Sequence, residues 1–218
     1  MDDKQLVMIH TVSPLLDVFN RLGGELLPGI GLTHILDEPL LERVRQRGHL
    51  APEDSARLGT HVAVAEQTGA DAVLVTCSTI SPCVDDVRPE VSVPVIKIDE
   101  AMIAEAVAKG TKIGVVATNV TTLEPTRQLL QAQADEANKK IEVELVLVEN
   151  ALAALLSGDG ATHDHLVKKA VLELEECADV VVLAQATMAR VLDVIPESDR
   201  QVPILSSTHL ALERVGGL

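Results

Sequence analysis

Two stretches of the chain, 108 residues apart, repeat the same pattern of side chains. Residues 70–80 read ADAVLVTCSTI, and residues 178–188 read ADVVVLAQATM. Ala, Asp, Val and Thr recur at equivalent positions, and the apolar positions match throughout. Each stretch is a short run of Val and Leu that ends in small residues, which is typical of a buried parallel strand that leads into a helix. This repeat constrains the chain to a fold with two similar parts.

Further matches follow in the same order along the chain. Asp85 falls on Asp193, and Val93-Pro94 falls near Val202-Pro203. Residues 7–11 (VMIHT) correspond to residues 114–118 (GVVAT) at an offset of 107. One such match arises easily by chance, whereas several in order at a nearly constant offset indicate two related lobes. We predict a first lobe over residues 1–98, joined by a C-terminal helix over 208–218, and a second lobe over residues 99–207.

Short runs of Val, Ile and Leu alternate with segments of helical spacing along the whole chain. The predicted strands are Leu6–Thr11, Gly31–Ile35, Ala72–Cys77, Val93–Ile98, Lys112–Thr118, Ile141–Val148, Val180–Ala184 and Val202–Ser206. The predicted helices cover residues 39–47, 52–68, 82–90, 100–109, 122–138, 163–177 and 189–195. This alternation predicts an α/β fold with two pseudo-symmetric lobes, each a parallel sheet flanked by helices.

Composition excludes several classes of function. Hydrophobic residues make up 47% of the 218 residues, so a large core is available, yet Phe19 is the only aromatic residue. Nucleic-acid binding by base stacking needs aromatic platforms and basic grooves. The formal net charge of −15 repels polyanions. We therefore expect no nucleic-acid partner, and any anionic ligand must be bound by local dipoles.

The ends and the cysteines suggest a cellular location. The chain begins Met1-Asp2-Asp3-Lys4, which is not a signal peptide, and no apolar run approaches ~20 residues. Three cysteines, at positions 77, 83 and 177, form no CxxC pair, so neither a metal site nor a disulfide framework is predicted. We expect a cytoplasmic protein with no membrane contact and no metal site.

Small hydroxyl residues and helix starts follow several predicted strands. In open parallel sheets ligands bind outside the carboxyl ends of the strands, where helix N-termini offer free N–H groups. Ser13-Pro14 and Ser81-Pro82 look like N-caps followed by proline at the first helical position, and Thr121 to Glu124 looks like a capping box. We predict a site for a small carboxylate, with these candidate binding residues: Thr11, Ser13, Ser78, Thr79, Thr118, Asn119, Thr121, Thr187 and His209.

Cys77 stands at the end of one of these strands. A free cysteine is more often a buried filler of the core than a reactive group. Cys77 is flanked by Thr76, Ser78 and Thr79 and precedes a helix start, a setting that lowers the pKa of a thiol and raises its reactivity. We therefore predict a catalytic role for Cys77.

At this point the sequence resembles a known family. Thr76-Cys77-Ser78-Thr79 resembles the TCNT signature of the aspartate/glutamate racemase superfamily, which includes hydantoin racemases, maleate isomerases and arylmalonate decarboxylases. Residues 112–121 (KIGVVATNVT), 178–188 and 202–207 resemble its second-lobe opening, its second active-site strand and its last strand. The resemblance implies an active site in the cleft between the two lobes, no cofactor, one cysteine from each lobe acting on opposite faces of the substrate's α-carbon, and dimer formation.

Gln185 stands where the resemblance places the second cysteine, and the internal repeat shows the same substitution. A carboxamide forms hydrogen bonds but does not deliver a proton. Racemisation by two thiols is therefore disfavoured unless His10 or His209 replaces the missing acid. Three alternatives stay open: a racemase or isomerase in which Cys77 is the acid/base or nucleophile, a one-sided decarboxylase or tautomerase, and a non-catalytic protein that binds a small carboxylate.

Several other residues are predicted to have no role in the chemistry. We interpret Cys83 and Cys177 as packing residues, and the sequence His163-Asp164-His165 as a solvated helix start capped by Thr162. His34, His49 and His61 show no partner pattern. Asp37 is expected to end a strand and open a helix. As partners we expect a small carboxylate substrate and a second copy of the chain, in a homodimer or higher homo-oligomer.

Overall fold

A computed structural model describes residues 4–217 of the chain. Met1, Asp2 and Asp3 of the predicted first lobe, and Leu218 of the predicted C-terminal helix, lie outside the described residues. Contacts divide the chain into two compact units. Unit 1 comprises residues 1–98 and 208–218, and unit 2 comprises residues 99–207.

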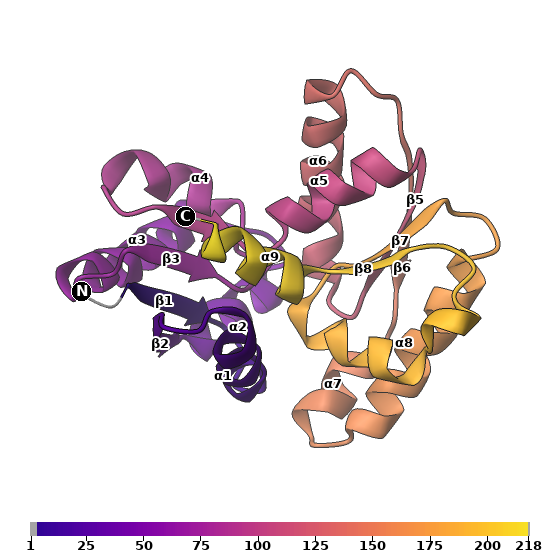
Figure 1. Ribbon diagram of the computed structural model, residues 1–218, viewed down its shortest axis with the longest axis horizontal. Helices are drawn as coiled ribbons and strands as arrows, with labels where there is room; N and C mark the ends of the chain where they lie inside the picture. Colours follow the sequence, from indigo (N-terminus) through magenta and orange to yellow (C-terminus); the bar gives the residue numbers. More distant parts are fainter. Residues whose placement is uncertain (1–3, 218) are drawn as a thin grey trace. The chain divides into compact units, whose positions relative to one another are not determined.

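Each unit is built on a four-stranded parallel sheet, and the two sheets have the same topology (Figure 1). The order is β2-β1-β3-β4 in unit 1 and β6-β5-β7-β8 in unit 2. The strands are β1 (Gln5–His10), β2 (Gly31–Leu36), β3 (Ala72–Val75), β4 (Val95–Lys97), β5 (Lys112–Ala117), β6 (Glu142–Leu147), β7 (Val180–Leu183) and β8 (Ile204–Ser206). The predicted α/β fold with two similar lobes is confirmed.

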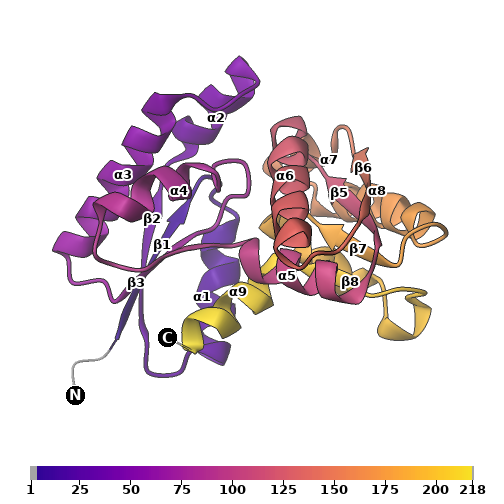
Figure 2. The ribbon, with the colours of Figure 1, turned by 90° about the horizontal axis from the view of Figure 1, so that it is seen from above.

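Helices cover both faces of the sheet in unit 1 (Figure 2). They are α1 (Leu15–Leu26), α2 (Glu38–Arg47), α3 (Pro52–Gln67), α4 (Cys83–Val87), the 3₁₀ turn η1 (Arg88–Glu90) and α9 (Ser207–Gly216). One core lies between the sheet and α2, α3 and α4, and it includes Val75, Leu58 and Val84. Helix α1 is not among the predicted helices, although Ser13-Pro14 indicates a helix start just before it.

Unit 2 repeats this arrangement with α5 (Glu100–Lys109), α6 (Val120–Glu136), α7 (Ala151–Leu156), α8 (Gly160–Leu174) and the 3₁₀ segments η2 (Ala186–Val194) and η3 (Glu197–Asp199). A core between the sheet and α8 and η2 includes Val116, Leu183, Val167 and Val191. The predicted helix at 189–195 is thus a 3₁₀ segment that begins directly after Gln185. The short α7 was missed.

Within each sheet, the aspartate of the repeat binds the start of the neighbouring strand. Asp71 Oδ2 accepts a hydrogen bond from the Gln5 amide at 2.7 Å. Asp179 Oδ2 accepts from the amides of Thr111 and Lys112 at 2.8 Å each. Both aspartates thus satisfy amides at the start of the neighbouring strand, which explains structurally why Asp recurs in the repeat.

Two predicted helix caps are wrong. The helices α1 and α4 begin after Pro14 and Pro82, and neither helix has a side-chain cap. The Leu16 amide donates to the Ser13 carbonyl at 3.1 Å, and the Cys83 amide donates to the Ile80 carbonyl at 3.0 Å. The chain enters both helices through backbone turns, so the serine hydroxyls are not used as caps.

The other two caps lie earlier in the chain than predicted. Asn119 caps α6 and accepts from the Thr121 amide at 3.4 Å, in place of the predicted capping box. Asp159 caps α8 and accepts from the Thr162 amide at 3.0 Å. An Asn or Asp side chain reaches these amides from the position before the helix. Within residues 4–217, no helix is both long and apolar enough to cross a membrane.

Candidate active site

Cys77 lies in the turn between β3 and α4, at the carboxyl end of the unit 1 sheet. Its side chain is 9% exposed and contacts the aliphatic core that contains Val75 and Ile80. The turn is tight, because the Ile80 amide donates to the Cys77 carbonyl at 3.2 Å. Cys77 thus lies at the end of a strand, as predicted. Its sulfur is more buried than that of a typical reactive cysteine, which is partly exposed to solvent.

Four donors surround the Cys77 sulfur. They are the hydroxyls of Thr11 and Thr79 and the amides of Thr79 and Ile80. Thr11 follows β1 and the other donors follow β3, so neighbouring parallel strands bring them together. This arrangement stabilises negative charge on sulfur once a proton leaves, as the donors of an oxyanion hole stabilise oxygen.

Burial nevertheless raises the pKa of the Cys77 thiol above its ordinary value, and the hydrogen bonds from Thr11, Ile80 and Thr79 oppose this rise only in part. The predicted lowering of the Cys77 pKa is therefore wrong. Removal from water disfavours a thiolate more than these neutral donors favour it. The thiol is therefore protonated near neutral pH.

His10 lies beside this site but does not fit the role of the missing acid. It is fully buried, and burial with the neighbouring His34 lowers its pKa to about 3. Its Nδ1 is 2.8 Å from Thr76 Oγ1, and its Nε2 is 2.8 Å from His34 Nδ1. Because the Thr76 hydroxyl donates to the Ile9 carbonyl at 3.1 Å, it accepts from His10 Nδ1. Both ring nitrogens of the neutral His10 are thus occupied within unit 1.

The remaining predicted binding residues of unit 1 differ in burial and in whether their polar groups have hydrogen-bond partners. Ser78 Oγ is buried and has no hydrogen-bond partner, whereas Thr79 is buried and bonded. Ser13 is exposed, and its amide donates to Glu38 Oε1 at 3.3 Å. His209 is exposed in the first turn of α9. Ser78 is therefore the one of these four with a buried side-chain oxygen that lacks a hydrogen-bond partner.

In unit 2, Gln185 and Thr118 are joined at the carboxyl ends of β7 and β5. The Thr118 amide and Oγ1 lie 2.5 Å and 3.0 Å from Gln185 Oε1. The carbonyl oxygen of Gln185 is thereby used as an acceptor, and its NH₂ group remains as the donor end of the side chain.

Two predicted hydroxyls lie near this pair in the chain without partners. Thr121 Oγ1 in the first turn of α6 and Thr187 Oγ1 at the start of η2 are buried and form no hydrogen bond. Buried polar atoms are nearly always paired in folded proteins, so unpaired ones at the carboxyl ends of strands indicate groups that a ligand satisfies. Asn119, in contrast, is engaged as the cap of α6.

Sequence reasoning missed two clusters that contain histidine. Asp37 accepts from Arg57 Nε at 2.5 Å and lies 2.6 Å from His61 Nε2. Burial by itself raises the pKa of Asp37, but the hydrogen bonds from Arg57 and His61 outweigh it and lower this pKa. The i, i+4 spacing of Arg57 and His61 on one helix is the signal that was available.

The second cluster overturns the interpretation of residues 163–165 as a solvated helix start. His163 is 0% exposed, and its Nδ1 lies 2.8 Å from Asp164 Oδ1. Arg190 Nε donates to Asp164 at 2.9 Å. The signal was the apolar stripe of α8 at Val167, Val171 and Leu174, which His163 extends at helical spacing.

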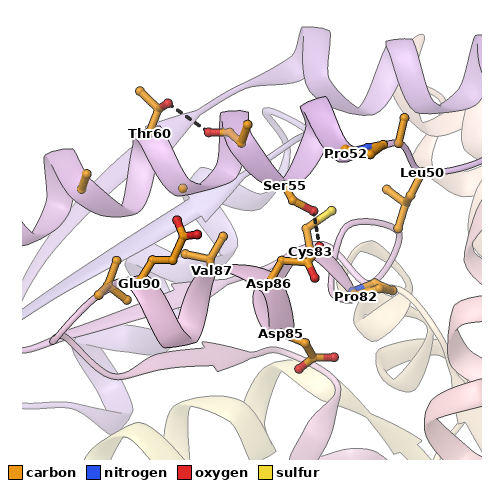
Figure 3. A pocket seen from close by; sticks show the side chains of 15 residues that line it. Leu50, Pro52, Ser55, Thr60, Pro82, Cys83, Asp85, Asp86, Val87 and Glu90 are labelled. Atoms are coloured by element: carbon orange, nitrogen blue, oxygen red, sulfur yellow. Dashed lines mark hydrogen bonds between the residues drawn. The ribbon is translucent and has the colours of Figure 1, made fainter.

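A groove of about 1140 Å³ lies in unit 1 between α3 and α4 (Figure 3). Cys83 lies in it, and Asp85, Asp86 and Glu90 give its wall negative charge. Cys77 and the other predicted site residues do not line this groove. Like charge makes it a poor site for a carboxylate. Among residues 4–217, no group of three or more His, Cys, Asp or Glu side chains is arranged to hold a metal ion.

The amino-acid sequence was compared with known protein families and with individual proteins. The family described as Asp/Glu/Hydantoin racemase matches residues 32–215. An uncharacterized protein of Schizosaccharomyces pombe is 24% identical over 153 residues, which cover 69% of this chain and 64% of that protein. The chain therefore spans slightly less than two thirds of that relative's length.

Solved structures share the fold at low sequence identity. Allantoin racemase from Klebsiella pneumoniae superposes with a TM-score of 0.74 at 18% identity, over 99% of this chain and 87% of that one. A glutamate racemase isoform from Bacillus anthracis gives 0.73 at 18% identity, over 100% and 82%. Picrophilus torridus aspartate racemase gives 0.70 at 14% identity, over 98% and 94%. With a family match over most of its length, the chain belongs to the Asp/Glu/Hydantoin racemase family, and these solved structures share its fold.

Proposed function

We propose that the protein is a cofactor-independent racemase or isomerase that acts on a small carboxylate through Cys77. The observation that carries the proposal is the set of four donors around a thiol at the carboxyl end of a parallel sheet. A thiolate formed during turnover is stabilised there without a permanent positive charge nearby. Membership of the racemase family supports the same reaction class.

The carboxylate is proposed to bind to groups that lack partners within the protein. In unit 1, next to Cys77 in the chain, the candidate group is the buried hydroxyl of Ser78. Unit 2, taken by itself, offers the NH₂ group of Gln185 and the buried hydroxyls of Thr121 and Thr187. Neutral donors suit a protein with a net charge of −15, because they attract the ligand only at short range. They also stabilise the negative charge that develops when the α-carbon loses its proton.

The test follows proton exchange at the α-carbon. Both enantiomers of aspartate, glutamate and malate, together with maleate, are incubated with the protein in D₂O, and deuterium incorporation and chirality are measured by NMR and chiral chromatography. Cys77→Ser is expected to lose at least about a hundredfold in rate, as proton-transfer groups typically contribute 10²–10⁴. Cys83→Ser, six residues along the chain and also buried, is the matched control.

The one-sided alternative is favoured by a single observation, which is that Gln185 stands in the second copy of the repeat where the first copy has Cys77. On that reading Cys77 exchanges the α-proton with retained chirality, as a decarboxylase or tautomerase does. Retention in the same D₂O experiment supports it, and loss of optical activity supports the racemase. A protein that binds these acids but exchanges nothing is the non-catalytic binder, and full activity in Cys77→Ser removes Cys77 from the chemistry.

A further inference from the structure

We propose that His34 is a positioning residue of the candidate active site. It fixes the tautomer of His10, and His10 in turn holds the chain next to Cys77. This inference rests on the proposed function and names a residue that acts without touching the substrate. The contacts that support it all lie within unit 1.

Two consecutive residues at the carboxyl end of β1 hold two consecutive residues that follow β3. The Thr76 amide donates to the Ile9 carbonyl at 3.0 Å, and His10 Nδ1 lies 2.8 Å from Thr76 Oγ1. One residue further on, the Thr11 hydroxyl donates to the Cys77 sulfur. The place of the sulfur beside β1 therefore depends on His10 as well as on Thr11.

From His10 the contacts continue away from Cys77 to the surface. His10 Nε2 lies 2.8 Å from His34 Nδ1 on the neighbouring strand β2. His34 Nε2 lies 3.0 Å from Oδ1 of the exposed Asn20 on α1. Because a side-chain amide presents either its oxygen or its NH₂ group by turning over, Asn20 pairs with His34 in either protonation state. A series of hydrogen-bonded side chains thus joins Asn20 to Thr76, the residue before Cys77.

The hydrogen bonds of Thr76 decide which nitrogen of His10 carries the hydrogen. The Thr76 hydroxyl donates to the Ile9 carbonyl at 3.1 Å, so it accepts from His10 Nδ1. Burial and the neighbouring His34 lower the pKa of His10 to about 3, so the ring has one hydrogen at neutral pH. Its Nε2 therefore accepts, and His34 Nδ1 is the donor. The hydrogen of His34 Nδ1 thus fixes the tautomer of His10.

Loss of the His34 donor would change the hydrogen bonds of Thr76. With no donor opposite Nε2, His10 is free to carry its hydrogen there, and its Nδ1 then becomes an acceptor. In that tautomer the Thr76 hydroxyl turns from the backbone carbonyl to His10. The ring itself stays in place, because His10 is fully buried against Phe19, with the ring centroids 5.5 Å apart. The position of one hydrogen on His10 therefore sets the hydrogen bonds at the start of the turn between β3 and α4.

The first experiment changes the donor at position 34 and observes the tautomer. His34→Leu removes the donor and keeps apolar bulk, whereas His34→Asn places an NH₂ group near the position of Nδ1. In full-length protein labelled with ¹⁵N-histidine, long-range ¹H–¹⁵N spectra distinguish a protonated ring nitrogen from one with a lone pair. The His10 signals are identified by their loss in His10→Gln. The wild-type protein and His34→Asn are expected to carry the His10 hydrogen on Nδ1, and His34→Leu to carry a large fraction of it on Nε2.

The second experiment measures α-proton exchange with aspartate, glutamate and malate in D₂O. His34→Leu is expected to lower kcat by at least about tenfold with KM close to that of the wild-type protein, because a small misplacement of a reacting group is costly. His34→Asn is expected to recover most of this loss. His49→Gln changes an exposed histidine of unit 1 that contacts the Arg47 carbonyl, and it is expected to exchange at the wild-type rate.

Alkylation of Cys77 reports on the site without a substrate. In a background of Cys83→Ser and Cys177→Ser, the rate with iodoacetamide should rise at higher pH in His34→Leu than in the wild-type protein. The reason is that a displaced sulfur loses hydrogen bonds that stabilise its thiolate. His34→Asn should keep the wild-type profile. If His34→Leu does not fold, His34→Val is used with the same expectations, because a branched side chain suits a strand.

The outcomes separate this inference from the proposed function. A wild-type His10 with its hydrogen on Nε2 overturns the inference, and so does a His34→Leu protein with wild-type exchange and alkylation. An equal loss of kcat in His34→Leu and His34→Asn also contradicts it, because the donor would then have no effect of its own. Absence of exchange from all these acids in the wild-type protein overturns the proposed function, and the tautomer and the alkylation profile then decide whether His34 positions Cys77.

Discussion

Thr118 lies with its amide nitrogen 2.5 Å and its Oγ1 3.0 Å from the side-chain oxygen of Gln185. This contact joins the carboxyl ends of two neighbouring strands, β5 and β7, and it turns the NH₂ group of Gln185 away from Thr118. Gln185, which corresponds to Cys77 in the repeat, therefore contributes a contact to the fold of unit 2.

Replacing Gln185 tests the two roles separately. Gln185→Ala leaves the Thr118 amide without its acceptor and is expected to destabilise unit 2 by about 1–3 kcal/mol. Gln185→Glu keeps an acceptor oxygen, so its stability is expected to stay closer to that of the wild-type protein, while its charge repels a carboxylate ligand. Urea unfolding measures the first effect, and titration with malate or glutamate measures the second. If Gln185→Ala had the same unfolding free energy as the wild-type protein, the contact with Thr118 would contribute nothing to stability.

The Cys77 thiol is expected to react slowly with alkylating agents at neutral pH. Burial raises its pKa, so the rate with iodoacetamide should rise only above the range of an ordinary thiol. Thr11→Val removes one donor to the sulfur and should move the rate profile to still higher pH. The measurement uses a background of Cys83→Ser and Cys177→Ser, so that Cys77 alone is labelled. A profile that moves to lower pH in Thr11→Val contradicts the hydrogen bond.

His10 is expected to make the protein less stable in acid. Its pKa falls from 6.5 to about 3 on folding, so the unfolded chain binds the extra proton between these values. The contribution is fully present above about pH 6.5 and is lost as the pH falls toward 3. The lowering corresponds to roughly 5 kcal/mol, an order-of-magnitude figure for a buried imidazole.

Urea unfolding at several pH values tests this expectation. His10→Gln should flatten the dependence of the unfolding free energy on pH between about 3 and 6.5. The exposed His165, changed to Gln, serves as the control and should leave the slope as it is. A wild-type slope in His10→Gln would mean that another group causes the loss of stability.

The repeated aspartates are expected to contribute unequally to stability. Asp179 accepts three hydrogen bonds from Thr111 and Lys112, which lower its pKa to about 2, whereas the contact from Asp71 is a single bond to the Gln5 amide. Asp179→Ala should therefore lower Tm more than Asp71→Ala. The stabilisation by Asp179 should be lost as the pH falls from about 3.8 through 2, because its folded pKa is lowered. Thermal scans at neutral and acidic pH check both expectations.

The sequence by itself determined the strands and their alternation with helices. Runs such as residues 72–75 and 180–183 are apolar on both faces, which only a covered parallel sheet accommodates, and the repeat shows that this occurs twice. The position of Cys77 after a strand, and of Gln185 at the equivalent place, follows from the same pattern. Helix caps were less certain, because Asn119, two residues before Thr121, and Asp159, three residues before Thr162, are the side chains that accept from the first amides of α6 and α8.

Only the tertiary structure decided the state of the polar groups. The pKa of Cys77 depends on the burial of the sulfur, and Cys77 belongs to a core that includes Leu58 and Val62, which are distant in the chain. His163 is paired with its neighbour Asp164, and Asp164 in turn accepts from Arg190, which lies 26 positions away and approaches only when η2 contacts α8. Desolvation and pairing are set by neighbours that folding brings together, so no local pattern contains them.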